Sequence, residues 1–268
     1  MAKIIENYSE LTNDYKAMDR KVTALTFFVV LGYVLVAFYA IMIFTRNFSF
    51  EFAAAVIIYM GITKQIIKPM LKKAQNECNI IESGISGESR VQNRLSALPD
   101  SYTVIHNIVV DYDGQKNELD FVVVGPNGVF VIENKNNGGY IYGDAKDNQL
   151  SQQKNYGTKT FRNPVKQVGM QTYRLRGLFN KLGINQWIQP VVYFSNPEAQ
   201  VSISNCEIPV FTTSDLFNDS IVKYITEYNN GRTVSPLAKT AIVSALTNTK
   251  AERNVRTAST YTYQSIVD

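Results

Sequence analysis

The sequence lacks the residues on which several common classes of enzyme depend. Histidine occurs once, as His106, and cysteine twice, as Cys78 and Cys206, far apart in the chain. Neither a disulfide framework nor a Cys/His zinc site is therefore indicated, and a reducing compartment fits best. No serine stands in a nucleophile-elbow pattern, so a hydrolase triad is not expected. Walker-type and dinucleotide-binding glycine patterns are absent as well.

Length and net charge give only broad limits. The 268 residues suffice for one compact domain with an appendage, but hardly for two catalytic domains. The formal net charge of +4 is too small to identify a binding partner by itself. The distribution of charged and apolar residues along the chain is more informative.

A long uncharged segment lies near the N-terminus, from Val22 to Thr45. It has the length of a membrane span, and it is too long and too far from the first residue for a cleaved signal peptide. A second apolar stretch, from Phe52 to Thr63, is followed by lysines and is short for a span. With snorkelling lysines it can still cross with the first stretch as a helical hairpin over residues 22–67. The alternative is a buried or interfacial helix.

Basic residues flank both ends of this hairpin, at Lys16, Arg20 and Lys21 before it and from Lys64 onward after it. The positive-inside rule therefore predicts that both ends lie in the cytoplasm. We expect an integral protein of a prokaryotic cytoplasmic membrane, with residues 1–21 and the folded domain in the cytoplasm. Residues 68–85 suit a helical stalk.

The folded domain is predicted to cover residues 86–228. Ser86 is a good N-cap, and the following apolar residues are spaced as one helix face until Pro99. Glu88 lies near the start of that helix on the same face. A carboxylate there can simply complement the helix dipole, or it can point into a site.

Three segments rich in Val, Ile, Phe and Tyr follow, and they predict a meander of strands over Tyr102–Asp111, Glu118–Gly125 and Gly128–Asn136. Their continuous apolar runs indicate strands covered on both faces, as in an α/β or α+β core. The predicted fold is thus a mixed central sheet flanked by helices, preceded by N-terminal membrane helices.

Charged residues stand at the ends of these strands. Glu133 and Lys135 are two apart and share one face, because side chains alternate along a strand. A two-residue turn at Pro126 and Asn127 would set Asp120 opposite Glu133, whereas a bulge at Gly128 would shift the register by one. Neighbouring carboxylates repel unless a cation lies between them, and oxygen ligands of this kind suit Mg²⁺ or Mn²⁺. The alternative is a surface ion pair between Glu133 and Lys135.

These residues resemble the NERD (nuclease-related domain) group of the PD-(D/E)xK nuclease superfamily. The resemblance runs from Glu88 through Glu118-Leu119-Asp120 and Gly128-Val-Phe-Val-Ile-Glu133-Asn-Lys135, and continues in Gly138–Gly143 and in Asn163-Pro164-Val-Lys-Gln167. It implies a restriction-endonuclease-like core and a metal-dependent nuclease. By position, Asp120 and Glu133 would bind Mg²⁺ or Mn²⁺, Glu88 would support the metal site, Lys135 would serve catalysis and Gln167 would line the site.

Downstream, Asn163 and Pro164 are typical of a helix start. Between Lys146 and Lys181 we count eight basic residues and a single acid, Asp147. Such a charge distribution suits a phosphate backbone, although a solvated helix face explains part of it. The predicted nucleic-acid-binding residues are Lys154, Lys159, Arg162, Lys166 and Arg174. A helix is expected from Thr213 to Tyr228, and a C-terminal helix with a polar tail over residues 229–268.

We therefore expect a membrane-anchored nuclease that cuts DNA in preference to RNA. The alternatives are a non-catalytic nucleic-acid-binding or scaffold protein that keeps the nuclease fold, and an assembly factor whose hairpin forms a homo-oligomer. Small residues at 53–55 and at Gly61 would allow helices to approach closely in the latter case.

Overall fold

The computed structural model describes residues 1–6, 10–47, 49–214 and 220–248. The chain divides into two compact units between Ser86 and Gly87. One unit runs from Ser9 to Ser86 and is helical. The other joins the first residues of the chain to everything from Gly87 onward, and contains all the strands that the structure describes.

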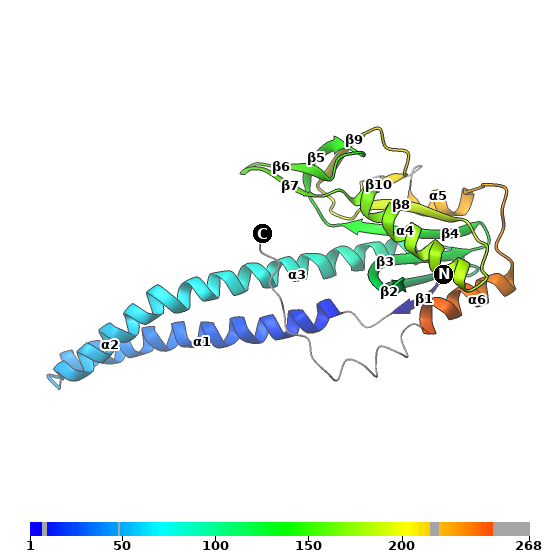
Figure 1. Cartoon of the computed structure of the whole chain (residues 1–268). Helices are drawn as coiled ribbons and strands as arrows, with labels where there is room; N and C mark the ends of the chain where they lie inside the picture. Colours follow the sequence, from blue (N-terminus) through cyan, green and yellow to red (C-terminus); the bar gives the residue numbers. More distant parts are fainter. Residues whose placement is uncertain (7–9, 48, 215–219, 249–268) are drawn as a thin grey trace. The chain divides into compact units, whose positions relative to one another are not determined.

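The helical unit is a pair of long antiparallel helices (Figure 1). The first is α1, and the second is a continuous rod of α2, the π-helical turn η1 and α3. The Tyr59 hydroxyl donates to the Phe28 carbonyl at 2.6 Å, and the rings of Phe38 and Phe52 pack edge to face. These contacts fix the pairing of the two helices. Their bounds are α1 (Glu10–Phe44), α2 (Phe50–Ile62), η1 (Thr63–Ile67) and α3 (Lys68–Leu95).

Both members of this pair are long and apolar enough to cross a membrane by length and composition. Only 6% of the most apolar window of the first and 11% of that of the second is buried within the protein. A core helix of a globular domain would instead be covered by its neighbours. Large apolar side chains such as Phe27, Val34 and Ile57 are exposed accordingly.

The predicted strand meander is present and forms the centre of the larger sheet. The strand order is β1-β2-β3-β4-β8-β10, in which β2, β3 and β4 are antiparallel and the outer pairings are parallel. The bounds are β1 (Lys3–Glu6), β2 (Thr103–Tyr112), β3 (Gln115–Gly125), β4 (Gly128–Lys135), β8 (Ile188–Phe194) and β10 (Val210–Thr212).

A second, smaller sheet has the order β7-β6-β5-β9. Its strands β6 and β7 form a hairpin whose turn carries the fully exposed Tyr156. Strand β5 contains most of the Gly138–Gly143 segment in which the sequence resemblance continues. The bounds are β5 (Gly139–Asp144), β6 (Gln149–Lys154), β7 (Gly157–Arg162) and β9 (Ala199–Ser204).

Helices cover both faces of the larger sheet, as the apolar strands predicted. Helices α4 (Pro164–Lys181) and α6 (Pro236–Asn248) pack on one face through Val168, Leu175 and Ile242. The end of α3 and helix α5 (Ile221–Glu227) pack on the other, through Leu95 and Ile225. The result is a mixed α/β domain, which confirms the predicted fold class.

Two predicted helix starts are wrong. Ser86 does not cap a new helix, because α3 continues through it from Lys68 to Leu95. No proline interrupts the chain between Pro69 and Pro99, so nothing stops the helix. The helix expected from Thr213 begins at Ile221 instead, with Ser220 as its N-cap. Residues 215–219 of that prediction lie outside the described residues.

The domain also draws on both ends of the chain beyond the expected boundaries. Strand β1 lies within the N-terminal segment 1–21, yet it pairs with β2, Lys3 opposite Thr103. Helix α6, expected in a separate C-terminal segment, buries Ile242 and Leu246 in the domain core. The folded unit is therefore larger than residues 86–228.

Candidate active site

The β3–β4 hairpin brings the two predicted carboxylates to one position. Gly125 pairs with Gly128 across the two-residue turn, which confirms that turn and excludes the bulge. The ladder then runs in the same register to Phe121 opposite Ile132. The next position on each strand is Asp120 and Glu133, so the two carboxylates meet where the pairing ends.

Glu133 is fully buried and held by charged and polar partners. The Lys135 ammonium lies 2.5 Å from Glu133 Oε1, and the Gln171 side chain of α4 donates to Oε2 at 2.6 Å. Gln171 also donates to the Glu118 carbonyl at 3.0 Å. The alternative of an exposed surface ion pair is thereby excluded, since a buried charge requires such partners.

Asp120 is half-buried beside this cluster. Its Oδ2 accepts a hydrogen bond from the Asn134 backbone N–H at 2.7 Å. Burial raises the pKa of Asp120 well above its usual range, and the neighbouring Glu133 carboxylate raises it further. The Asn134 hydrogen bond and Lys135 oppose this shift without cancelling it. The protein therefore does not fully compensate the negative charge of an ionised Asp120.

The sheet is distorted where Asp120 stands. The β2–β3 ladder passes from His106 opposite Phe121 to Ile108 opposite Leu119, and omits the pair between them. That pair is Asn107 and Asp120, and Asn107 has a φ of 54°. Asparagine tolerates this left-handed conformation better than most residues, and such backbone is concentrated at functional sites.

Glu88 reaches the same area from the end of α3. Burial raises its pKa, a hydrogen bond with the Asn107 side chain opposes the shift, and Glu118 adds to it. The helix is held close to the sheet by Gly87, where an added Cβ would lie 2.8 Å from Asn136. Arg90 donates to the Asn136 side chain at 2.9 Å and strengthens this contact.

Two residues of this cluster were not predicted. Gln171 is the glutamine of α4 that binds Glu133, and it stands one turn after the predicted Gln167, which is half-buried on the same helix. Asn107 holds Glu88. The available signals were a glutamine four residues beyond Gln167 and a polar residue inside the apolar β2 segment, but neither shows from sequence alone what it contacts.

The predicted basic residues fall into two groups. Lys154, Lys159 and Arg162 lie exposed on the β6–β7 hairpin. The others are engaged on the domain itself: Lys166 donates to Asn148, and Arg174 donates to Gln115 and Asn117. The hairpin group therefore carries the cations most available to an external phosphate chain.

The donor set fits a hard divalent cation only in part. Asp120 and Glu133 offer carboxylate oxygens in a place where negative charge is under-compensated. Within the described residues, however, no group of three or more His, Cys, Asp or Glu side chains is arranged to hold a metal. An ion bound here would complete its shell with water and substrate oxygens, which is how Mg²⁺ is usually held.

The fold and the site together define a mixed α/β domain with a buried carboxylate–lysine cluster at the end of a central hairpin. Residues 83–195 match the family model described as the nuclease-related domain, NERD. The resemblance predicted from the sequence is confirmed.

Other comparisons add little about activity. An uncharacterized protein of Bacillus anthracis is 40% identical over 86 residues, which cover 31% of this chain and 41% of that protein. This chain thus matches less than half the length of that relative. No solved structure matches.

The pKa of Asp120 leads to a stability prediction for Asp120→Asn. The pKa of Asp120 is higher in the folded protein than in the unfolded chain. At pH values between these two pKa values the folded protein therefore binds more protons than the unfolded chain does. The free energy of unfolding consequently falls as the pH rises through this interval. Asparagine keeps an acceptor for the Asn134 N–H but carries no charge. We expect the variant to melt above the wild-type protein at neutral pH, with the difference shrinking toward acid pH.

The measurement is thermal unfolding of the full chain in detergent with EDTA, from about pH 4 to about pH 8. Asp111→Asn, which changes an exposed aspartate of β2, serves as the control. A difference between Asp120→Asn and wild type that stayed constant with pH would contradict the expectation.

Proposed function

We propose that this protein is a membrane-anchored, divalent-metal-dependent nuclease that hydrolyses phosphodiester bonds of DNA. The observation that carries the proposal is the buried Glu133, paired with Lys135 at 2.5 Å and placed beside Asp120 at the end of the hairpin. The NERD match over residues 83–195 supports a nuclease-related role. Burying a charged cluster is costly, so its presence favours chemical use.

In this proposal Asp120 and Glu133 hold Mg²⁺ or Mn²⁺, with Glu88 supporting the site from α3. When bound, the cation polarises a phosphoryl oxygen and lowers the pKa of a water molecule. Lys135 orients that water and stabilises negative charge as the water oxygen bonds to phosphorus and the bond to the leaving oxygen breaks. The hydrogen bond from Gln171 holds the Glu133 carboxylate in one orientation throughout the proposed reaction.

The β6–β7 hairpin is proposed to bind the nucleic acid backbone. The hairpin carries exposed cations at 154, 159 and 162, and its turn carries the exposed Tyr156, a side chain on which a base can stack. Charge attraction of this kind is independent of sequence and does not by itself distinguish DNA from RNA. The other predicted contacts, Lys166 and Arg174, would have to leave their partners on the domain to reach phosphate.

The anchor is proposed to be the pair of long helices. Their apolar side chains are exposed over most of their length, which favours contact with lipid. Basic residues precede the apolar part of α1, at Lys16, Arg20 and Lys21, and follow the apolar part of the second rod from Lys64 onward. By the positive-inside rule, these residues favour a cytoplasmic position for the domain.

The test uses the full chain in detergent with supercoiled, linear and single-stranded DNA and with RNA. Each substrate is incubated with Mg²⁺, with Mn²⁺ or with EDTA. Cleavage that requires the metal is expected, and the preferred substrate identifies the nucleic acid. An absence of cleavage, with salt-sensitive binding retained, would replace the proposal by a non-catalytic binding or scaffold role.

A binding prediction concerns the hairpin lysines. The double substitution Lys154→Gln and Lys159→Gln should weaken DNA binding and lower the slope of log affinity against log salt by about 2, because each lysine neutralises about one phosphate. Lys181→Gln with Lys223→Gln, which removes two exposed lysines elsewhere on the domain, is the matched control. Equal slopes for the two double variants would show that the hairpin is not the binding surface.

A further inference from the structure

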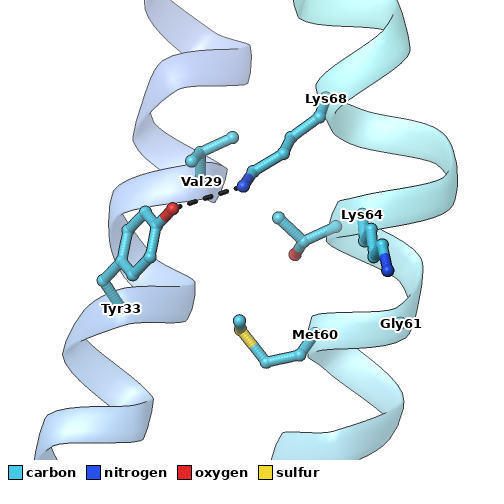
Figure 2. Close-up of a pocket in the computed structure, with 7 residues that line it drawn as sticks. Val29, Tyr33, Met60, Gly61, Lys64 and Lys68 are labelled. Carbon is cyan, nitrogen blue, oxygen red and sulfur yellow. Dashed lines mark hydrogen bonds between the residues drawn. The ribbon is translucent and has the colours of Figure 1, made fainter.

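A cavity lies between the two long helices, with a volume of about 320 Å³. Figure 2 shows Tyr33 and Val29 of α1 facing Lys68 and Met60 of the opposite rod across it, with Lys64 turned away from α1 on the same rod. Thr63 also lines the cavity. All these residues belong to the helical unit, Ser9–Ser86. The lining of the cavity combines apolar side chains with a small group of polar atoms.

The polar atoms can all donate hydrogen bonds to an anion. The Lys68 ammonium donates to the Tyr33 hydroxyl at 3.3 Å and lies 5.7 Å from the centre of that ring (Figure 2). Lys64 stands one turn earlier at the edge of the lining, from where its flexible side chain brings a second positive charge near the cavity. The lining residues include no carboxylate, so this cavity carries two positive charges without an acidic partner.

Thr63 gives the second, independent indication of a ligand. Its side chain is 3% exposed, and its hydroxyl is buried without a hydrogen-bond partner among the described residues. A threonine in a helix usually satisfies its hydroxyl on a carbonyl of the preceding turn. A buried hydroxyl left unpaired costs free energy, so a polar group bound in the cavity would remove a real penalty.

The backbone at this point departs from the α-helix. Residues Thr63–Ile67 form the π-helical turn η1, between α2 and α3. π-Helical turns are rare and are found frequently at functional sites. Here the turn carries Thr63, whose unpaired hydroxyl lies at the cavity, and Lys64, which also lines it.

The cavity lies near the end of the apolar part of the hairpin. On the second rod the apolar stretch that begins at Phe52 ends at Thr63, and Lys64 and Lys68 follow it. On α1 the lining residues Val29 and Tyr33 lie about 10 to 17 Å beyond Val22, at about 1.5 Å of rise per residue. Long lysine side chains at the end of an apolar stretch can reach the phosphate groups at the boundary between hydrocarbon and water.

We propose that the cavity binds the phosphate of an anionic phospholipid, with Lys64, Lys68, Tyr33 and Thr63 as ligands. The inference rests on the proposed membrane anchor and is independent of the nuclease activity. The apolar walls at Val29 and Met60 favour a lipid over free phosphate, because they accommodate acyl chains beside the headgroup. Basic pockets between membrane helices bind anionic headgroups by the same chemistry.

The test is a titration of the full chain in detergent with phosphatidylglycerol, followed by native mass spectrometry. Phosphatidylcholine and inorganic phosphate are titrated in parallel. The variants are Lys64→Gln with Lys68→Gln, and separately Thr63→Val and Tyr33→Phe, which keep shape and charge. The control is Lys72→Gln with Lys73→Gln, which removes two exposed lysines of the same rod outside the cavity.

We expect the Lys64/Lys68 variant to bind phosphatidylglycerol about 10- to 30-fold more weakly, because two ammonium groups no longer attract the headgroup. Thr63→Val and Tyr33→Phe should weaken binding by smaller factors, and the control should bind as the wild-type protein does. Equal weakening in the control, or equal binding of phosphatidylcholine, would overturn the proposal. So would inorganic phosphate binding as tightly as the lipid, which would assign the cavity to a free anion. Cleavage of DNA by the same variants should be unchanged, so the two proposals fail separately.

Discussion

Alanine at Asp120, at Glu133 or at Lys135 is expected to reduce metal-dependent DNA cleavage by about 10²- to 10³-fold or more, while binding of DNA is retained. Each substitution removes either an oxygen ligand of the proposed cation or the positive charge beside it. Because the three groups act as one unit, the double variant Glu133→Ala with Lys135→Ala should lose little more activity than either single variant.

The protein contains a matched control for this experiment. Lys181 and Asp113 form a second ion pair, at 2.6 Å, whose side chains are 56% and 64% exposed. Alanine at either position removes a charge of the same type as in the site, but exposed ion pairs contribute little to stability. Cleavage should survive both control substitutions. Wild-type turnover in Asp120→Ala, Glu133→Ala or Lys135→Ala would remove the assignment of the site.

The second large effect is expected from Gln171→Ala. Its amide donates to both the Glu133 carboxylate and the Glu118 carbonyl, and so ties α4 to the end of the hairpin. Removal of a hydrogen bond that orients a metal-binding carboxylate typically costs about 10- to 100-fold in metal affinity or activity. We expect a loss in this range, with a higher Mg²⁺ concentration needed for half-maximal cleavage.

Gln167→Ala is the comparison, since it shortens a glutamine one turn earlier on the same helix. The sequence resemblance assigns the role to Gln167, whereas the hydrogen bond to Glu133 comes from Gln171. The measurement is cleavage rate against Mg²⁺ concentration for both variants. If Gln167→Ala requires more Mg²⁺ than Gln171→Ala does, Gln167 and not Gln171 is the glutamine that supports the metal site.

The parts of the site that the sequence predicted are those set by local geometry. The Gly-Pro-Asn-Gly turn fixes the register of the hairpin, and the register then sets Asp120 beside Glu133. The alternation of side chains along a strand places Glu133 and Lys135 on one face. Both steps require only neighbouring residues, so a single sequence suffices for them.

The parts that were missed depend on residues far apart in the chain. Gln171 meets Glu133 only after α4 has packed on the sheet, and the left-handed backbone of Asn107 has no distinct sequence pattern. Strand β1 is four residues long, and its partner lies a hundred residues further on. The break predicted at Ser86 was wrong for a different reason: a serine that can cap a helix is also tolerated inside one.

The pairing of β1 with β2 has a consequence for the path of the chain through a bilayer. Lys3–Glu6 and Thr103–His106 lie in one sheet, so both must be on the same side of the membrane. The chain between them therefore crosses an even number of times. If α1 spans, the second rod has to return, and a single-span arrangement is excluded without any appeal to the distribution of lysine and arginine.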